Sequence, residues 1–202
     1  MSVLFDQQMA LQQEGDRLVE LLHLDTVLAD IGQPVRVGSS ALGLMVRRDI
    51  DITIICASLG PDTLARFAAV GARLMGMDRH VLAVRFRNDA GPWNADPAAY
   101  PDGLYLGLSV RAQDRHDWTL DIWAVDQPAR QPDLNHLRTI PPRLTDRHRQ
   151  IILTLKHALS TRPKGVDVPQ SAQVYEAVLD HGVQDLQQLQ AWFIGMAQKL
   201  PT

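Results

Sequence analysis

The spacing of apolar residues along the first 125 positions changes repeatedly between helical and strand periods. Helical spacing covers residues 4–31, with an expected break at Asp25-Thr26 and Gly32 as the stop signal, and it returns after Pro61. Strand spacing predicts five strands, at 34–37, 50–57, 80–87, 104–111 and 118–125. The first part of the chain therefore mixes helices and strands.

Beyond residue 126 the pattern is helical alone. Residues 128–142 are rich in proline and are expected to be irregular. Thr145, Ser171 and Asp185 are expected to cap three helices, of which the second ends at Gly182.

This order of elements predicts an α/β (α+β) fold, in which a mixed sheet is flanked by helices and followed by a C-terminal helical part. A chain of 202 residues suits one globular domain, or one domain with a helical appendage. The expected units are an α/β domain at 1–126, an irregular linker at 127–143 and a helical part at 144–202.

Composition excludes several classes of protein. The single cysteine, Cys56, excludes an intramolecular disulfide, and its apolar surroundings in the sequence predict that it is buried. A net charge of −3 argues against binding of bulk nucleic acid. The N-terminus does not resemble a signal peptide, and no apolar window reaches the roughly 18 residues of a membrane span. A cytoplasmic protein without membrane association is expected.

Positive charge is concentrated in residues 127–165, which carry eight Lys or Arg residues against two acids. Either this segment faces an anionic ligand, or it is a solvated basic surface. Residues in it that phosphates could contact are Arg143, Arg147, Arg149 and Lys156. A second open question concerns the aromatic segment 93–103, which is either a platform for a base or an acceptor, or a structured Ω-loop.

Two stretches carry candidate chemistry. The strand that ends at Gly38-Ser39 offers backbone N–H groups, which favour a phosphate if a helical turn begins there. On the next strand, Asp49 and Asp51 share one face because side chains alternate along a strand. Two such carboxylates repel each other unless a cation lies between them, and hard oxygen ligands suit Mg²⁺.

A third carboxylate is needed for a two-metal site, and Asp121 is the best candidate. It lies in the middle of the apolar strand 118–125. If this strand pairs with 50–57, Asp121 faces the same metals. The alternative is an acid that forms a salt bridge with Arg85 or Arg87.

The pattern Gly-Ser-x-Ala-x-Gly over 38–43, followed by five residues and Asp-x-Asp at 49–51, resembles the signature of the DNA polymerase beta-like nucleotidyltransferase superfamily. The similarity is greatest to small bacterial members, which include antibiotic-modifying enzymes. It covers 35–57 and, loosely, 120–123. The resemblance implies that Gly38 and Ser39 hold a triphosphate, that Asp49 and Asp51 hold Mg²⁺ or Mn²⁺, and that Asp121 binds the catalytic metal and takes the acceptor's proton.

The sequence departs from this signature at several positions. Small members often carry Arg where this chain has Ser40 and Leu42, and Ser or Thr where it has Arg48. Ser40, Arg48 and Lys156 complete the expected nucleotide contacts. Arg47 or Arg48 either supplies the missing positive charge or pairs with the aspartates.

The function expected from the resemblance is transfer of a nucleoside monophosphate from an NTP to a hydroxyl group of a small molecule or a protein. Two alternatives stay open. One is a catalytically idle member that binds only a nucleotide or a protein partner. The other is the nucleotidyltransferase half of a toxin–antitoxin pair. A homodimer and a protein partner are both compatible with the sequence.

Overall fold

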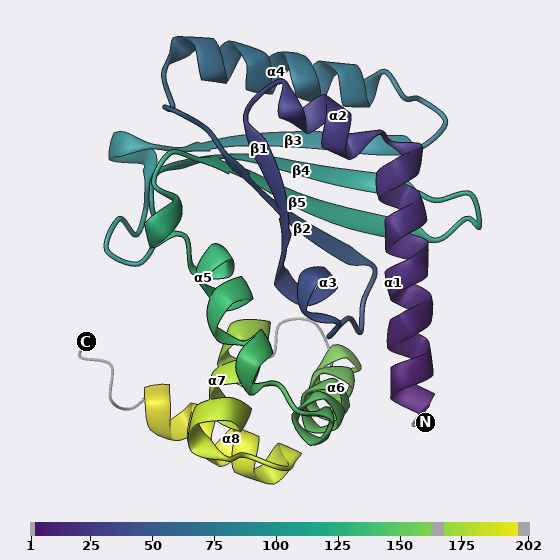
Figure 1. Cartoon of the computed structure of the whole chain (residues 1–202), viewed down its shortest axis with the longest axis vertical. Coiled ribbons are helices and arrows are strands. Elements are labelled where there is room, and N and C mark those ends of the chain that lie inside the picture. Colours follow the sequence, from purple (N-terminus) through teal and green to yellow (C-terminus); the bar gives the residue numbers. More distant parts are fainter. Residues whose placement is uncertain (1–2, 163–167, 198–202) are drawn as a thin grey trace.

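A five-stranded mixed sheet organises the computed structural model, which describes residues 3–162 and 168–197. The strands lie in the order β1-β2-β5-β4-β3 (Figure 1). Strands β2 and β5 run parallel, and the other neighbouring pairs run antiparallel. In chain order the strands are β1 (Gln33–Val37), β2 (Asp49–Ile55), β3 (Val81–Asp89), β4 (Gly103–Arg111) and β5 (Asp117–Val125).

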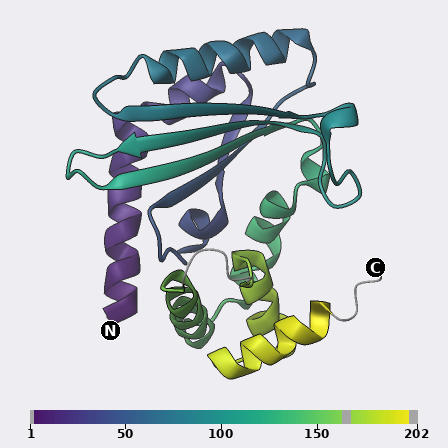
Figure 2. The same ribbon diagram turned by 180° about the vertical axis from the view of Figure 1, so that it is seen from behind.

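One face of the sheet is covered by helices from the first part of the chain (Figures 1 and 2). Even-numbered residues of β2, β4 and β5 turn toward these helices, because side chains alternate along a strand. Among them Ile50, Leu106 and Leu120 are fully buried in the larger apolar core. The covering helices are α1 (Val3–Leu21), α2 (Leu24–Ala29) and α4 (Pro61–Met75).

The opposite face carries the polar residues of the same strands. Asp49 and Asp51 of β2, Asp121 of β5 and Tyr105 of β4 occupy odd-numbered positions on it. All four side chains are half-buried. This face is therefore available for chemistry while the other holds the sheet together.

A second apolar core joins the C-terminal helices to the connection between β1 and β2. That connection contains the short helix α3 (Gly38–Leu42) and contributes Leu42 and Leu44 to the core. The helical part lies below the sheet in Figure 1, in green to yellow. Its helices are α5 (Pro132–Thr139), α6 (Asp146–Ser160), α7 (Ser171–His181) and α8 (Leu186–Ala197).

The predicted α/β class is confirmed, with a mixed sheet, flanking helices and a C-terminal helical part. The Thr145 hydroxyl caps α6 by accepting from the His148 N–H, and the Asp185 carboxylate accepts from the N–H of Gln188 in α8. Gly182 ends α7 in the left-handed conformation. Cys56 is buried as predicted. The proposed boundaries between the units remain a prediction.

Three local predictions are wrong. The first helical segment breaks at His23, which adopts a left-handed conformation, and not at Asp25-Thr26. Residues 128–142 are not irregular, because Pro132 occupies the first turn of α5, where a missing N–H costs nothing. Gln170 precedes α7 as its cap, so that Ser171 is the first helical residue. Short 3-10 turns at Gly91–Trp93, Pro128–Arg130 and Pro141–Arg143 complete the chain.

Among the described helices, none combines the length and the hydrophobicity that crossing a membrane would require.

Candidate functional site

The three predicted aspartates meet on the open face of the sheet. Asp51 of β2 and Asp121 of β5 are direct partners in the parallel register, and Asp49 precedes Asp51 by one pleat. One carboxylate oxygen from each lies within 4.8 Å of the others. The strands that carry them are paired, which was the condition for Asp121 to face Asp49 and Asp51. We call these three residues the aspartate triad.

The turn after β1 brings backbone against this triad. Gly38 begins α3 with a φ of 63°, a left-handed conformation that favours glycine. A Cβ atom at this position would collide with the Asp51 carboxylate. The glycine thus serves both the turn and the close approach of the chain to Asp51. Ser39 follows it and lines the neighbouring cavity.

Negative charge accumulates in the triad. The pKa of Asp51 is raised to about 8, first by burial, then by the negative charges of Asp49, Asp133 and Asp121. The pKa of Asp49 is also raised by burial, although the Thr119 hydroxyl donates a 2.7 Å hydrogen bond to its carboxylate and opposes the shift. Without a cation, the site therefore favours a protonated Asp51.

Lys156 of α6 places a buried positive charge beside the triad. Its side chain is 7% exposed, and its ammonium group donates to the Leu44 carbonyl at 2.8 Å and to the Tyr175 hydroxyl at 3.1 Å. Burial lowers its pKa to about 8, although Asp51 and Asp49 favour the charged form. Lys156 is thus held close to the triad without a direct ion pair to it.

A cavity of about 210 Å³ lies between the triad and the helical part. Ser39 and Asp49 line it from the α/β side, and Lys156 and Ser171 line it from the helices. Arg47 completes a polar wall, so the cavity offers two cationic side chains beside a carboxylate. This arrangement suits an anion that is itself bound to a metal ion.

Two predicted contacts do not reach this cavity. The Ser40 hydroxyl is buried and donates to the Val37 carbonyl at 3.2 Å. Arg48 points instead to Glu14 of α1, to which its Nε donates at 3.1 Å. Arg48 therefore neither lines the cavity nor forms an ion pair with the triad.

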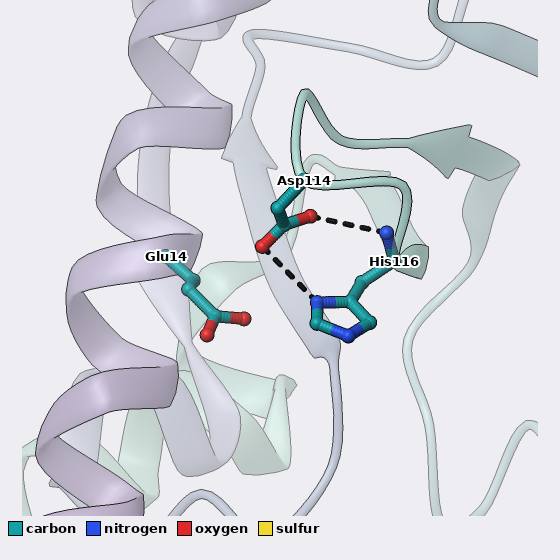
Figure 3. A group of neighbouring side chains, drawn as sticks. All are labelled: Glu14, Asp114 and His116. Carbon is teal, nitrogen blue, oxygen red and sulfur yellow. Dashed lines mark hydrogen bonds and ion pairs between the residues drawn. The ribbon is translucent and has the colours of Figure 1, made fainter.

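Glu14 belongs to a second group of potential ligands, which we call the turn cluster: Glu14, Asp114 and His116 (Figure 3). Asp114 and His116 lie in the exposed turn between β4 and β5. The Asp114 carboxylate accepts from the His116 N–H at 3.0 Å and lies 3.1 Å from the His116 Nδ1 (Figure 3). One atom from each of the three residues lies within 4.8 Å of the others.

The three arginines that were considered with Lys156 as phosphate contacts have other partners. Arg143 forms an ion pair with Asp180. Arg147 donates to the Gln184 side chain, and Arg149 donates to the Leu42 carbonyl at 2.7 Å. Of the four basic residues considered from the sequence, only Lys156 lines the cavity.

On the β4 side of the triad, the Tyr105 hydroxyl donates a hydrogen bond to Asp121. Burial and this bond raise the pKa of Tyr105 to about 12. The Arg87 guanidinium lies 4.9 Å from the centre of the Tyr105 ring, but its ion-pair partner is Asp89 at 2.7 Å. The alternative in which Asp121 pairs with an arginine is therefore not observed among the described residues.

The aromatic segment 93–103 borders a further cavity of about 400 Å³ on the same side of the sheet. Tyr100 and Pro101 line it from the segment, and Trp123 and Arg87 line it from the strands. Trp123 is two residues beyond Asp121 on β5, so both face the same side. The segment thus lies beside the triad, although its own role is not fixed by this geometry.

Comparison with known proteins finds only distant similarity. No protein-family model matches the chain, and no curated protein does. Among solved structures, the chain is similar to a cytoplasmic RNA terminal U-transferase, with 15% sequence identity and a TM-score of 0.47. The similarity covers 74% of this chain but only 40% of the other one. A similarity of this size identifies neither a substrate nor an acceptor.

Sequence reasoning missed Tyr105 and Asp133, and it left Arg47 as one of two options. Tyr105 alternates with the apolar residues of β4, which places it on the open face once β4 is paired with β5. Pairing the two strands in the sequence would therefore have identified Tyr105 as a residue close to Asp121. Asp133 could not be found, because its segment was expected to be irregular.

Proposed function

We propose that the protein transfers a nucleoside monophosphate from a nucleoside triphosphate to a hydroxyl group, in a reaction that depends on Mg²⁺ or Mn²⁺. The observation that carries this proposal is the aspartate triad, with one oxygen from each residue within 4.8 Å of the others on two adjacent parallel strands. The Gly38-to-Asp51 motif, which resembles that of DNA polymerase beta-like nucleotidyltransferases, supports the same reaction class.

The donor set fits a hard divalent cation. Carboxylate oxygens are the ligands that Mg²⁺ prefers, and two ions about 3.5–4 Å apart could share oxygens at the observed spacing. Burial, followed by the negative charges of Asp49, Asp133 and Asp121, raises the pKa of Asp51 to about 8, which supports binding of a cation here. When bound, such ions neutralise phosphate oxygens and make a hydroxyl easier to deprotonate. Asp49, Asp51 and Asp121 would hold them.

The residues around the cavity suit the phosphates of the nucleotide. Gly38 and Ser39 bring backbone against Asp51, and Lys156 and Arg47 provide positive charge. At about 210 Å³ the cavity is smaller than the roughly 300 Å³ at which pockets for drug-sized ligands begin, so it accommodates part of a nucleotide. In this proposal Arg47 takes the place that the sequence offered to Arg48, and the helical part covers the nucleotide.

Asp121 is the best-placed group to take the acceptor's proton. Asp49 lines the cavity and Asp121 does not, and the Asp121 carboxylate already accepts a hydrogen bond from the Tyr105 hydroxyl. A carboxylate within hydrogen-bond reach of the attacking hydroxyl meets the geometric condition for a general base.

Calorimetric titration tests the proposal without knowledge of the acceptor. Non-hydrolysable analogues of ATP, GTP, CTP and UTP are each titrated with and without Mg²⁺. We expect at least one to bind only with the metal, and Asp51→Asn to remove this binding. Asp121→Asn should retain the nucleotide, because Asp49 and Asp51 would still hold the ion that carries its phosphates. If no nucleotide binds under any condition, the partner-binding alternative replaces this proposal.

A further inference from the structure

The Tyr105 hydroxyl occupies the position at the triad that an acceptor hydroxyl would need. It donates a hydrogen bond to Asp121, the carboxylate to which proton transfer is assigned above. Tyr105 lies on β4, next to β5, and its side chain is half-buried and faces the same side of the sheet as the triad. A nucleophile and its base are thus already in contact.

The Tyr105 hydroxyl can reach Asp121 because the residue beside it, Gly107, has no side chain. Gly107 is the register partner of Asp121, and it lies two residues beyond Tyr105 on the same face of β4. A Cβ atom on Gly107 would lie only 2.6 Å from the Tyr105 hydroxyl oxygen. The phenol therefore extends over the glycine and reaches Asp121.

Two further side chains fix the ring independently of the triad. The Trp123 and Tyr105 ring centroids are 5.0 Å apart. The Arg87 guanidinium lies 4.9 Å from the Tyr105 centroid and 5.3 Å from the ring of Trp123. Such contacts stabilise one orientation of the ring, so the hydroxyl is presented to Asp121 by packing as well as by its hydrogen bond.

The arrangement across the sheet also suits an in-line displacement. Asp51, Asp121 and Gly107 form one row, on β2, β5 and β4. The cavity with Lys156 lies at the Asp49 side of the triad, and Tyr105 lies at the opposite side. A phosphorus atom held at the triad would thus have the phosphate-binding cavity on one side and the phenol on the other.

We infer that Tyr105 is itself an acceptor, so that the protein nucleotidylates its own tyrosine. The inference rests on the proposed function. The phenol oxygen forms a bond to the α-phosphorus of the NTP, and the bond from this phosphorus to the pyrophosphate oxygen breaks. The proton passes to Asp121, and pyrophosphate leaves with the bonding electron pair. The product is a tyrosine phosphodiester, and each chain is labelled at this residue once.

The experiment incubates the full chain with each of the four NTPs and Mg²⁺ or Mn²⁺, followed by intact mass measurement and peptide mapping. We expect one nucleoside monophosphate per chain, on Tyr105. Tyr105→Phe should reduce labelling to background, whereas Tyr100→Phe, in a tyrosine exposed on the nearby loop, should leave it unchanged. Asp121→Asn should slow labelling by about 100-fold or more.

A second variant and a binding measurement keep the outcome decisive. Gly107→Ala displaces the phenol from Asp121 and should reduce labelling of an intact Tyr105. Calorimetry with non-hydrolysable NTP and Mn²⁺ should give the same affinity for Tyr105→Phe as for the wild type. If nucleotide binds but Tyr105 is never labelled, the tyrosine only positions Asp121. The inference is then wrong, whereas the proposed function stands. If no nucleotide binds, the proposed function fails with it.

Discussion

The aspartate triad and the turn cluster are similar in spacing and opposite in electrostatics. In each, ligand atoms from three residues lie within 4.8 Å of one another. The carboxylates of the turn cluster already have partners, since Arg48 forms an ion pair with Glu14 and the His116 ring lies 3.1 Å from the Asp114 carboxylate. The triad has no ion pair among the described residues, and its member Asp51 has a pKa of about 8.

The difference shows that closeness of ligands does not by itself define a metal site. The charge of a solvated carboxylate that already has an ion-pair partner is neutralised without a metal. A cation would have to displace that partner in order to bind. Half-buried carboxylates without an ion pair gain most from a cation, because burial and the neighbouring carboxylates raise the pKa values of Asp49 and Asp51. Divalent metal is therefore expected at the triad, and the turn cluster serves as its natural control.

The largest expected difference is in metal affinity. Asp51→Asn should weaken Mn²⁺ binding by more than about 100-fold, because even residues behind the direct ligands cost 10–100-fold when changed. Asp114→Asn should change it by less than about threefold. Calorimetric titration with Mn²⁺ measures both. A loss for Asp114→Asn as large as that for Asp51→Asn would contradict the assignment of the ion to the triad alone.

The second largest change in metal affinity is expected when a methyl group is added beside the triad. Gly38→Ala should lower Mn²⁺ affinity by roughly 10-fold or more, because the new Cβ displaces the Asp51 carboxylate. Its left-handed φ also costs about 1 kcal/mol of folding stability.

Gly182→Ala is the matched control for that substitution. Gly182 has a φ of 65°, and a Cβ there would meet nothing within 4 Å. It should lose a similar stability in chemical denaturation while binding Mn²⁺ as the wild type does. If both variants bind normally, contact between Gly38 and Asp51 does not shape the metal site.

The folding stability that depends on Asp51 and the stability that depends on Asp114 should change with pH in opposite directions. The unfolded Asp51 carboxyl loses its proton near 3.8, but the folded one keeps it to about 8. Stability of the metal-free protein therefore falls as the pH rises between these values, and Asp51→Asn should remove this part of the decline. Saturating Mg²⁺ should reduce it as well.

For Asp114 the folded pKa is lowered, first by the hydrogen bond from the His116 N–H. Its contribution to stability is present above the unfolded pKa of 3.8 and is lost as the pH falls through the lower, folded value. Thermal melts of Asp51→Asn and Asp114→Asn, compared with the wild type from acid to pH 9, measure both effects. Differences of the same sign would contradict the contrast between the clusters.

The smallest effect is expected for the ion pair between Arg48 and Glu14. Both side chains are partly exposed, so Glu14→Gln should cost less than about 1 kcal/mol in urea denaturation. Mn²⁺ affinity should stay within about twofold of the wild type. A large fall in Mn²⁺ affinity would show that Arg48, once released, acts on the triad.

The sequence predicted the part of the site that depends on strand periodicity. Asp49 and Asp51 share a face because of the period of two, and the apolar run around Asp121 made this residue the candidate for the third carboxylate. That its strand pairs with β2 was only a condition of the prediction. The directions of long side chains were not predictable in this way. Arg48 turns to Glu14, a residue 34 positions earlier, and no local pattern encodes that contact.

Local signals also misled where tertiary structure overrode them. Prolines suggested an irregular segment at 128–142, although a proline in the first turn is compatible with the helix that α5 forms. Tyr105 was overlooked because it looked like one polar position in an alternating strand. Its hydroxyl reaches Asp121 because Gly107 has no side chain in the way. That contact can be seen only when β4 and β5 are paired.

The parallel pairing of β2 with β5 also has a consequence for how the protein is made. The contact between Asp49 and Thr119 spans 70 residues, and the hairpin of β3 and β4 lies between its two strands in the sequence. Closing a loop of this length costs conformational entropy before the contacts between the two strands can stabilise it. This pairing is therefore expected to form late in folding. On the ribosome, Asp49 and Asp51 emerge long before Asp121. A nascent chain therefore cannot assemble the triad, and chemistry at this site has to wait until the sheet is complete.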